Sequence, residues 1–125
     1  MKEISNAELT ILNLLWQRAP QSAQEIIEQL ASANDWQDKT VKTLLNRLVN
    51  KQAIGFDKQG RAYAYYPLIK QSEYQLKESE SFIQRLFSGR VAPLVAGFAK
   101  QKKLTEQDVN ELQQLIDQWK KDNPS

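Results

Sequence analysis

The sequence predicts a mainly α-helical protein that contains one small β-hairpin. Apolar residues recur at three- and four-residue spacing through most of the 125 residues, which is the period of helices packed on one face. A single aromatic-rich segment beside a glycine turn has the pattern of paired strands instead. A chain of this length, with 41% hydrophobic residues, can form one domain with a buried core and an appended element.

The first two helices begin with capping boxes. Ser5 and Glu8 form the first box, in which the serine hydroxyl accepts from a free backbone amide and the glutamate reaches back. Pro20 ends this helix, because the residue before a proline disfavours helical backbone. Ser22 and Glu25 form the second box, so a second helix is expected directly after it.

A third helix is expected from about Asp38 to about Gln52, and its two faces differ in chemistry. The apolar face consists of Val41, Leu44, Leu45, Leu48 and Val49. The opposite face carries Lys39, Thr40, Lys42, Thr43, Asn46, Arg47 and Asn50. Because the apolar face packs on a core, the opposite face, which has no acid and no large hydrophobe, is expected to point into solvent.

A β-hairpin follows the third helix. Residues 53–57 begin the first strand, residues 58–61 form the turn, and residues 62–67, which include three tyrosines, form the return strand. Gly60 suits a turn position with positive φ. Three short helices followed by such a hairpin are the element order of a winged helix, a helix-turn-helix variant whose hairpin is called the wing.

The C-terminal part is expected to be helical as well. One helix is predicted over about residues 70–88 and a last helix from Thr105, with a frayed tail from Lys120. We therefore predict a winged-helix DNA-binding domain at residues 1–70 and a helical dimerisation region at residues 71–125.

The apolar stripes of these last helices exceed what a small winged helix can cover. The surplus predicts self-association, because large exposed apolar patches mark interaction sites. The residues expected to form the dimer contact are Phe82, Leu86, Val109, Leu112, Leu115, Ile116 and Trp119. The alternative is that both helices pack on their own N-terminal domain.

Charge is concentrated in one block of a nearly neutral chain. Residues 39–70 have seven basic side chains and one acidic side chain, whereas residues 1–38 have a net charge of −4 and residues 71–125 of zero. A local basic block is what a surface for a polyanion needs. The alternative is a basic face that only interacts with solvent.

The basic helix, the wing and the charge together predict binding to double-stranded DNA. A recognition helix enters the major groove and reads base edges, while a wing contacts the backbone. The candidate DNA-binding residues are Lys39, Thr40, Lys42, Thr43, Asn46, Arg47, Lys58 and Arg61. A dimer would place two such helices on a palindromic operator. The alternative is a winged-helix protein-interaction module or a dimeric scaffold without sequence-specific DNA binding.

Composition argues against other functions. The chain has no Cys and no His, which removes thiol nucleophiles, disulfides, the commonest general base and the usual zinc ligands. There are no clustered carboxylates and no glycine-rich phosphate loop, so neither an enzyme nor a metal or cofactor site is expected. Without a signal peptide or an apolar run of about 20 residues, we expect a cytoplasmic protein.

Several segments resemble one family, the penicillinase repressors, also described as methicillin-resistance regulators. The most specific segment is Trp-x-x-Lys-Thr-Val-x-Thr-Leu-Leu-x-Arg-Leu at residues 36–48, and the wing sequence Gly-Arg-Ala-Tyr-x-Tyr-Tyr-Pro at residues 60–67 supports it. The similarity extends over residues 4 to 119. It implies a winged-helix repressor that dimerises through its C-terminal helices on a palindromic operator overlapping a promoter.

The resemblance also implies a means of induction. In β-lactam-responsive members of the family, a membrane sensor-protease triggers cleavage before the last helix, just ahead of a Phe that matches Phe98. The preceding residue is Gly97, where those members carry Asn. Gly97 and Phe98 are therefore the candidate cleavage positions. Copper-responsive relatives carry a C-terminal Cys cluster, which this chain lacks.

Overall fold

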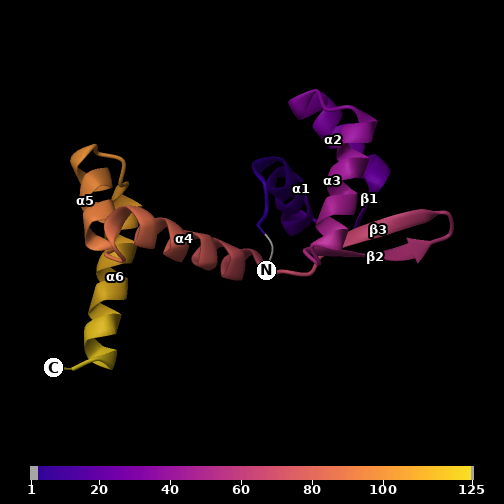
Figure 1. Ribbon diagram of the computed structural model, residues 1–125. Coiled ribbons are helices and arrows are strands. Elements are labelled where there is room, and N and C mark those ends of the chain that lie inside the picture. The colour runs from indigo at the N-terminus through magenta and orange to yellow at the C-terminus, as the bar shows by residue number, and fades with distance from the viewer. Residues whose placement is uncertain (1–2, 125) are drawn as a thin grey trace. The chain divides into compact units, whose positions relative to one another are not determined.

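Three helices and a three-stranded antiparallel sheet form the N-terminal part of the computed structural model, which describes residues 3–124 (Figure 1). The chain then continues as three further helices. In chain order the elements are α1 Asn6–Gln17, β1 Gln21–Ser22, α2 Ala23–Asn34, α3 Asp38–Asn50, β2 Ile54–Gln59, β3 Ala62–Pro67, α4 Gln71–Phe87, α5 Ala92–Lys100 and α6 Glu106–Asp122. The mainly helical fold with a small sheet is as the sequence predicts.

Capping boxes start three of the helices. In α1 the Ser5 hydroxyl accepts from the Glu8 amide and the Glu8 carboxylate accepts from the Ser5 amide, and Ser22 with Glu25 does the same for α2. Thr105 and Asp108 cap α6 in the same way. Each box satisfies two backbone amides that a helix start leaves without partners.

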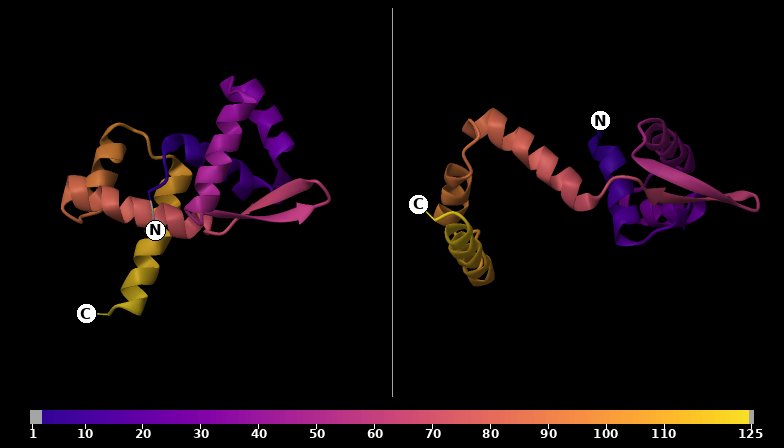
Figure 2. Two further views of the ribbon diagram at one scale, coloured as in Figure 1. Left: turned by 45° about the vertical axis from the view of Figure 1, so that its right-hand side comes forward. Right: turned by 90° about the horizontal axis from the view of Figure 1, so that it is seen from below.

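The sheet has the order β1-β3-β2, so it contains one strand more than the expected hairpin. The short strand β1 pairs antiparallel with β3, placing Ser22 opposite Ala64. The turn is also shorter than expected, because β2 extends to Gln59 and Lys58 pairs with Tyr63 inside the ladder. Gly60 has a φ of 64°, which suits this tight turn. Within the N-terminal part, the hairpin β2–β3 projects beyond α1, α2 and α3 (Figure 2).

One hydrophobic core lies between the three N-terminal helices and the sheet. Helix α3 contributes Val41, Leu44, Leu45 and Leu48, all buried, and Val49 is half-buried beside them. Helix α3 contacts both α1 and α2, which contribute Ile11, Leu12, Leu15, Ile26, Ile27 and Leu30 to the same core. The predicted apolar face of α3 is confirmed.

The chain divides into two compact units within α4. Residues up to Gln75 form the first unit, and residues from Leu76 form the second. Tyr74 explains why the first turn of α4 belongs to the first unit, because it is buried in the core and its ring lies 5.8 Å from that of Trp16. The Trp16 indole also donates to the Ile69 carbonyl oxygen at 2.9 Å.

The second unit differs from the expected helices in two respects. The residues after Gly89 form the separate helix α5, with Pro93 in its first turn, where a missing amide costs little. Helix α6 extends to Asp122, so the expectation of a frayed tail from Lys120 is wrong. None of the helices within residues 3–124 is long and apolar enough to cross a membrane.

Candidate nucleic-acid interface

Helix α3 presents the predicted polar residues to solvent. Lys39, Thr40, Lys42, Thr43, Asn46 and Arg47 are all exposed, while the apolar residues between them are buried. Burial of one stripe fixes the rotation of the helix, so these six side chains share the outer surface. The first four occupy the N-terminal half of the helix, the part that reaches base edges in helix-turn-helix proteins.

Among the residues that the structure describes, the cations of α3 and of the wing have no acidic partners. Within residues 3–124 the ion pairs are Arg18–Glu25 and Lys51–Glu8, and neither includes Lys39, Lys42, Arg47, Lys58 or Arg61. All five of these side chains are exposed. Their charge is therefore available to an external anion.

Lys51 belongs to the same basic block in the sequence but has a different role. Its ammonium donates to the Glu8 carboxylate at 2.6 Å and to the Glu3 carbonyl oxygen at 2.7 Å. The Glu8 residue is only 1% exposed. Lys51 therefore joins the end of α3 to the start of α1, and its charge is already paired.

The Glu8 carboxylate stays ionised although it is buried. Burial by itself opposes the charged form, but hydrogen bonds from Lys51 and Ser5 outweigh it and lower the pKa of Glu8 below its ordinary value. The pair therefore connects two helices through a charged, hydrogen-bonded contact at neutral pH.

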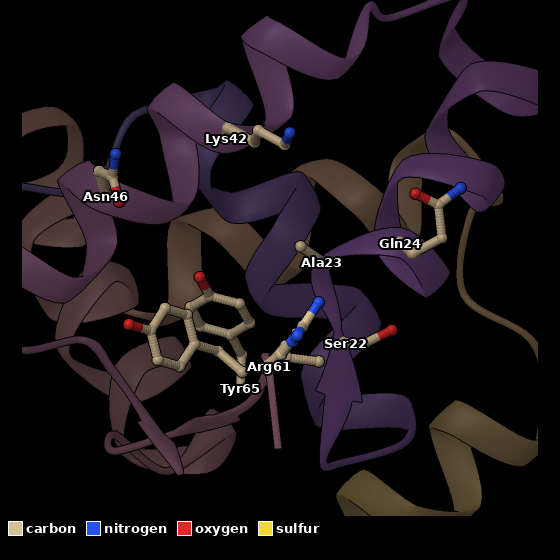
Figure 3. Close-up of a pocket in the computed structure, with 9 residues that line it drawn as sticks. Ser22, Ala23, Gln24, Lys42, Asn46, Arg61 and Tyr65 are labelled. Atoms are coloured by element: carbon tan, nitrogen blue, oxygen red, sulfur yellow. The ribbon is translucent and has the colours of Figure 1, made fainter. Parts of the chain in front are cut away.

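A cleft of about 410 Å³ lies between α2, α3 and the wing (Figure 3). Lys42 and Asn46 line it from α3, and Arg61 and Tyr65 from the wing. The start of α2 completes it with Ser22, Ala23 and Gln24, and its remaining lining residues are Ala62 and Tyr63. No acidic residue belongs to this lining. The cleft is therefore lined by two cations, Lys42 and Arg61, and by the N-terminus of α2.

Strand β1 and a buried glutamine hold α2 beside the wing. Gln21 donates to the carbonyl oxygens of Leu14, at 2.9 Å, and of Arg18, at 2.7 Å. It also accepts from Gln29 at 2.7 Å. Gln21 could not be recognised from the sequence, because a polar residue after a proline has no periodic signal of burial. Through these contacts the end of α1 fixes the start of α2, where the cleft begins.

The tyrosines of the wing have different surroundings. Tyr65 is buried, and this burial raises the pKa of its phenol above the ordinary value. Tyr63 is exposed on the same strand. Tyr63 is not among the DNA-binding residues expected from the sequence.

The residues expected to form a dimer contact are mostly uncovered in this chain. Phe82, Leu86, Val109, Leu115, Ile116 and Trp119 are exposed, and Leu112 is half-buried. Leu112 and Leu115 line a hollow between α5 and α6 together with Val95 and Leu104. In the described part of the second unit no residue is buried.

The candidate cleavage positions lie in a helix and not in an open linker. Gly97 and Phe98 belong to the last turns of α5. The Gly97 carbonyl oxygen, on the bond expected to be cut, accepts from the Gln101 amide at 3.2 Å, and that of Phe98 from the Lys103 amide at 3.0 Å. Cleavage stays a prediction, and it would require this end of α5 to open.

Metal binding has no support in the described residues. Across residues 3–124 no three acidic side chains come together in a way that could hold a metal ion. The side chains that line the cleft are cations, amides, hydroxyls and aromatic rings, with two alanines.

An exposed cationic helix packed beside a basic hairpin defines a winged helix-turn-helix protein. The chain belongs to the penicillinase repressor family, whose sequence model matches residues 4–118. It is 33% identical to the penicillinase repressor of Bacillus licheniformis over 94% of this chain and 92% of that protein. It is also 33% identical to the methicillin resistance regulatory protein MecI of Mammaliicoccus sciuri, over 91% and 93% of the two chains.

Solved structures support the fold of the first unit. The DNA-binding domain of the repressor BlaI is 36% identical, with a TM-score of 0.54 over 59% of this chain and 94% of that one. The monomeric form of Bacillus licheniformis BlaI, in complex with the blaP half-operator, is also 36% identical. Its TM-score is 0.52, over 58% of this chain and 89% of that one.

Proposed function

We propose that this protein is a sequence-specific DNA-binding transcriptional repressor that acts as a homodimer on a palindromic operator. In this proposal α3 lies in the major groove, the wing contacts the backbone, and the bound dimer blocks a promoter. The observation that carries the proposal is the set of five exposed cations on α3 and the wing, none of which forms an ion pair with another residue of the described range 3–124. A DNA-bound repressor of this kind acts in the cytoplasm and needs no catalytic group.

Within α3, Arg47 and Lys42 are assigned different tasks. Arginine can form two hydrogen bonds with guanine in the major groove, so Arg47 is the candidate for base reading. Lys42 lines the cleft with Arg61, where a backbone phosphate would meet two cations. Ala23 and Gln24, in the first turn of α2, line the same cleft, so helix amides outside the capping box are near that phosphate as well.

The test is binding to DNA from upstream of the chain's own gene, compared with a scrambled duplex over a range of salt. Specific binding with a steep salt dependence is expected. Arg47→Ala should weaken specific binding about 5- to 150-fold. The control is Lys77→Ala, which removes an exposed positive charge from the second unit. Equal losses in both variants would contradict the assignment of Arg47.

Dimerisation is inferred from the uncovered apolar surface of the second unit. Leu115 is 66% exposed and Trp119 is 63% exposed, one helical turn apart on α6. Burying such side chains against a second copy removes apolar area from water, which is the main favourable term in association. A dimer would also present two α3 helices to the two halves of an operator.

The dimer is tested by replacing Leu115 and Trp119 together with Gln. Sedimentation is expected to give a monomer. Operator binding should weaken, because a monomer contacts one half-site of the operator whereas the dimer contacts both. Gln114→Ala on the same helix is the control, since Gln114 is polar and exposed. A double variant that remains dimeric at the same concentration would contradict this interface.

The alternative function is a protein-interaction module built on the same fold. The outer face of α3, which carries neither an acidic residue nor a large hydrophobic residue, argues against it, because protein-binding surfaces favour aromatic residues within a mixed polar rim. A variant with Lys39, Lys42 and Arg47 changed to Glu separates the two functions. Loss of operator binding supports a DNA-binding repressor, whereas retained binding would contradict it.

A further inference from the structure

An aromatic cluster covers one face of the wing. Phe56 lies opposite Tyr65 in the β2–β3 register, and Lys58 lies opposite Tyr63. Because side chains alternate along strands, these residues share one face of the hairpin. The ring centroids of Phe56 and Tyr63 are 4.7 Å apart, and those of Tyr63 and Tyr65 are 6.5 Å apart.

Only the inner member of this cluster is covered by the protein. Tyr65 is buried, whereas Tyr63 is 44% exposed and Phe56 is 42% exposed. Two adjacent rings at the surface leave apolar area in water. The rings hold each other in place, so their exposed faces are preorganised for a partner.

The surroundings of Tyr63 indicate what that partner is. Tyr63 lines the same cleft as Lys42, Asn46 and Arg61, which connects it directly to the outer surface of α3. Lys58 adds a further cation beside it across the hairpin. A partner that contacts this surface must therefore carry negative charge and also offer flat or apolar groups between the charges.

The backbone of DNA has this alternation, because each phosphate is separated from the next by an apolar deoxyribose ring. The Lys42 and Arg61 side chains of this cleft can contact phosphates, while the exposed ring of Tyr63, which lines the same cleft, can pack on a sugar. Such packing buries apolar area and releases no counterion, so its contribution does not depend on salt in the way that an ionic contact does.

We propose that Tyr63, supported by Phe56, is a further DNA-contact residue, whose ring packs on a deoxyribose of the strand that Arg61 and Lys42 hold by its phosphates. This inference rests on the proposed repressor function. In this inference the wing makes an apolar contact with DNA in addition to its ionic contacts. The apolar contact comes from the face of strand β3 and not from the turn.

The experiment compares three variants of the full-length protein by operator binding over a range of salt. Tyr63→Thr removes the ring and keeps a residue that strands favour. It is expected to weaken binding about 5- to 10-fold at every salt concentration, with an unchanged salt slope. Tyr63→Phe keeps the ring and should bind within about twofold of the parent. Arg61→Ala, as the ionic comparison, should reduce the salt slope by about one.

Several results would overturn the inference. If Tyr63→Thr binds like the parent, the ring makes no contact. If Tyr63→Phe loses as much as Tyr63→Thr, the hydroxyl is the contact, and if Tyr63→Thr reduces the salt slope, the contribution is ionic. Loss of binding on Arg47→Ala but not on Tyr63→Thr would reject only this inference, whereas a parent protein that does not bind any operator specifically would reject the proposed function.

A second measurement uses the unaltered protein, so it does not depend on a variant folding. Tetranitromethane nitrates accessible tyrosines, and mass spectrometry locates the modified residue. Tyr63 is expected to react in the free protein and to be protected by the operator but not by a scrambled duplex at the same salt. Tyr66, which is half-buried, serves as the internal reference. Equal reaction of Tyr63 with and without the operator would contradict the contact.

Discussion

The two compact units contain similar helices but bury them to very different extents. In the first unit the apolar residues of α1, α2 and α3 form one enclosed core with the sheet. In the described part of the second unit, the large apolar residues are half-buried at most. The apolar periodicity that predicts a helix therefore does not by itself decide whether the helix is covered by its own chain.

Polar contacts differ between the units in the same way. The first unit has contacts between distant segments, such as Lys51 with Glu8 and Trp16 with Ile69. In α6 the side-chain pairs are local, one turn apart: Gln107 with Glu111, Gln113 with Asp117 and Gln118 with Asp122. Local pairs stabilise a helix, but they do not fix it against a neighbour.

The strongest test of this comparison separates the two units. A fragment of residues 1–75 is expected to unfold cooperatively on heating, because it keeps the core and the covered Tyr74. A fragment of residues 76–125 is expected to gain helicity as its concentration rises, because its apolar faces need a partner. Circular dichroism over a dilution series measures both. If the fragment of residues 76–125 has high helicity at every concentration, its helices need no partner, and the contrast between the two units is contradicted.

The next largest effect is expected from the core of the first unit. Leu45→Ala should lower the free energy of unfolding by about 3 kcal/mol, since a buried leucine leaves a cavity. Leu115→Ala is the matched change in the second unit, and in dilute protein it should change stability little. Urea denaturation at two protein concentrations measures both. If Leu115→Ala costs as much as Leu45→Ala in dilute protein, the second unit has a core of its own.

A smaller effect is expected from the Glu8–Lys51 pair. Lys51→Met should lower the free energy of unfolding by about 2 kcal/mol at pH 7, because it leaves the buried Glu8 carboxylate without its cation. The pKa of Glu8 is lowered in the folded state, so its stabilising contribution is present above its ordinary pKa of 4.5 and is lost as the pH falls further. The difference between parent and variant should therefore shrink below about pH 4.5.

Denaturation at several pH values measures this difference. Arg18→Met is the control, because it removes the partner of Glu25 from an ion pair that is largely exposed, and it should leave stability close to that of the parent. A difference between the parent and Lys51→Met that stays constant from pH 7 to pH 3 would mean that Lys51 acts through packing and not through charge.

The smallest effect is expected from Trp16→Phe. This change keeps an aromatic ring beside Tyr74 and removes the indole hydrogen bond to the Ile69 carbonyl oxygen. A loss of about 1 kcal/mol is expected, the usual net contribution of one hydrogen bond. Thermal unfolding followed by far-ultraviolet circular dichroism measures it. An unchanged melting temperature would mean that water replaces the indole at Ile69.

Part of the interface could be predicted from the sequence because it depends on local pattern. The burial of Leu44 and Leu48 turns Lys42, Thr43 and Arg47 outward, and the spacing of these residues alone gives that result. Lys51 could not be separated from the other cations in this way. Its partner Glu8 lies 43 residues earlier, and only the packing of α1 against α3 brings the two together.

The sequence by itself determined the starts of α1, α2 and α6, the outward face of α3 and the wing, because capping, periodicity and turn chemistry act between residues a few positions apart. Only the tertiary structure decided that β1 joins the sheet, that Gln21 is buried and that Tyr63 stays exposed beside the cleft. These features depend on which distant segments pack together. A two-residue strand or a single polar side chain has no periodicity of its own, so its neighbours in space determine its role.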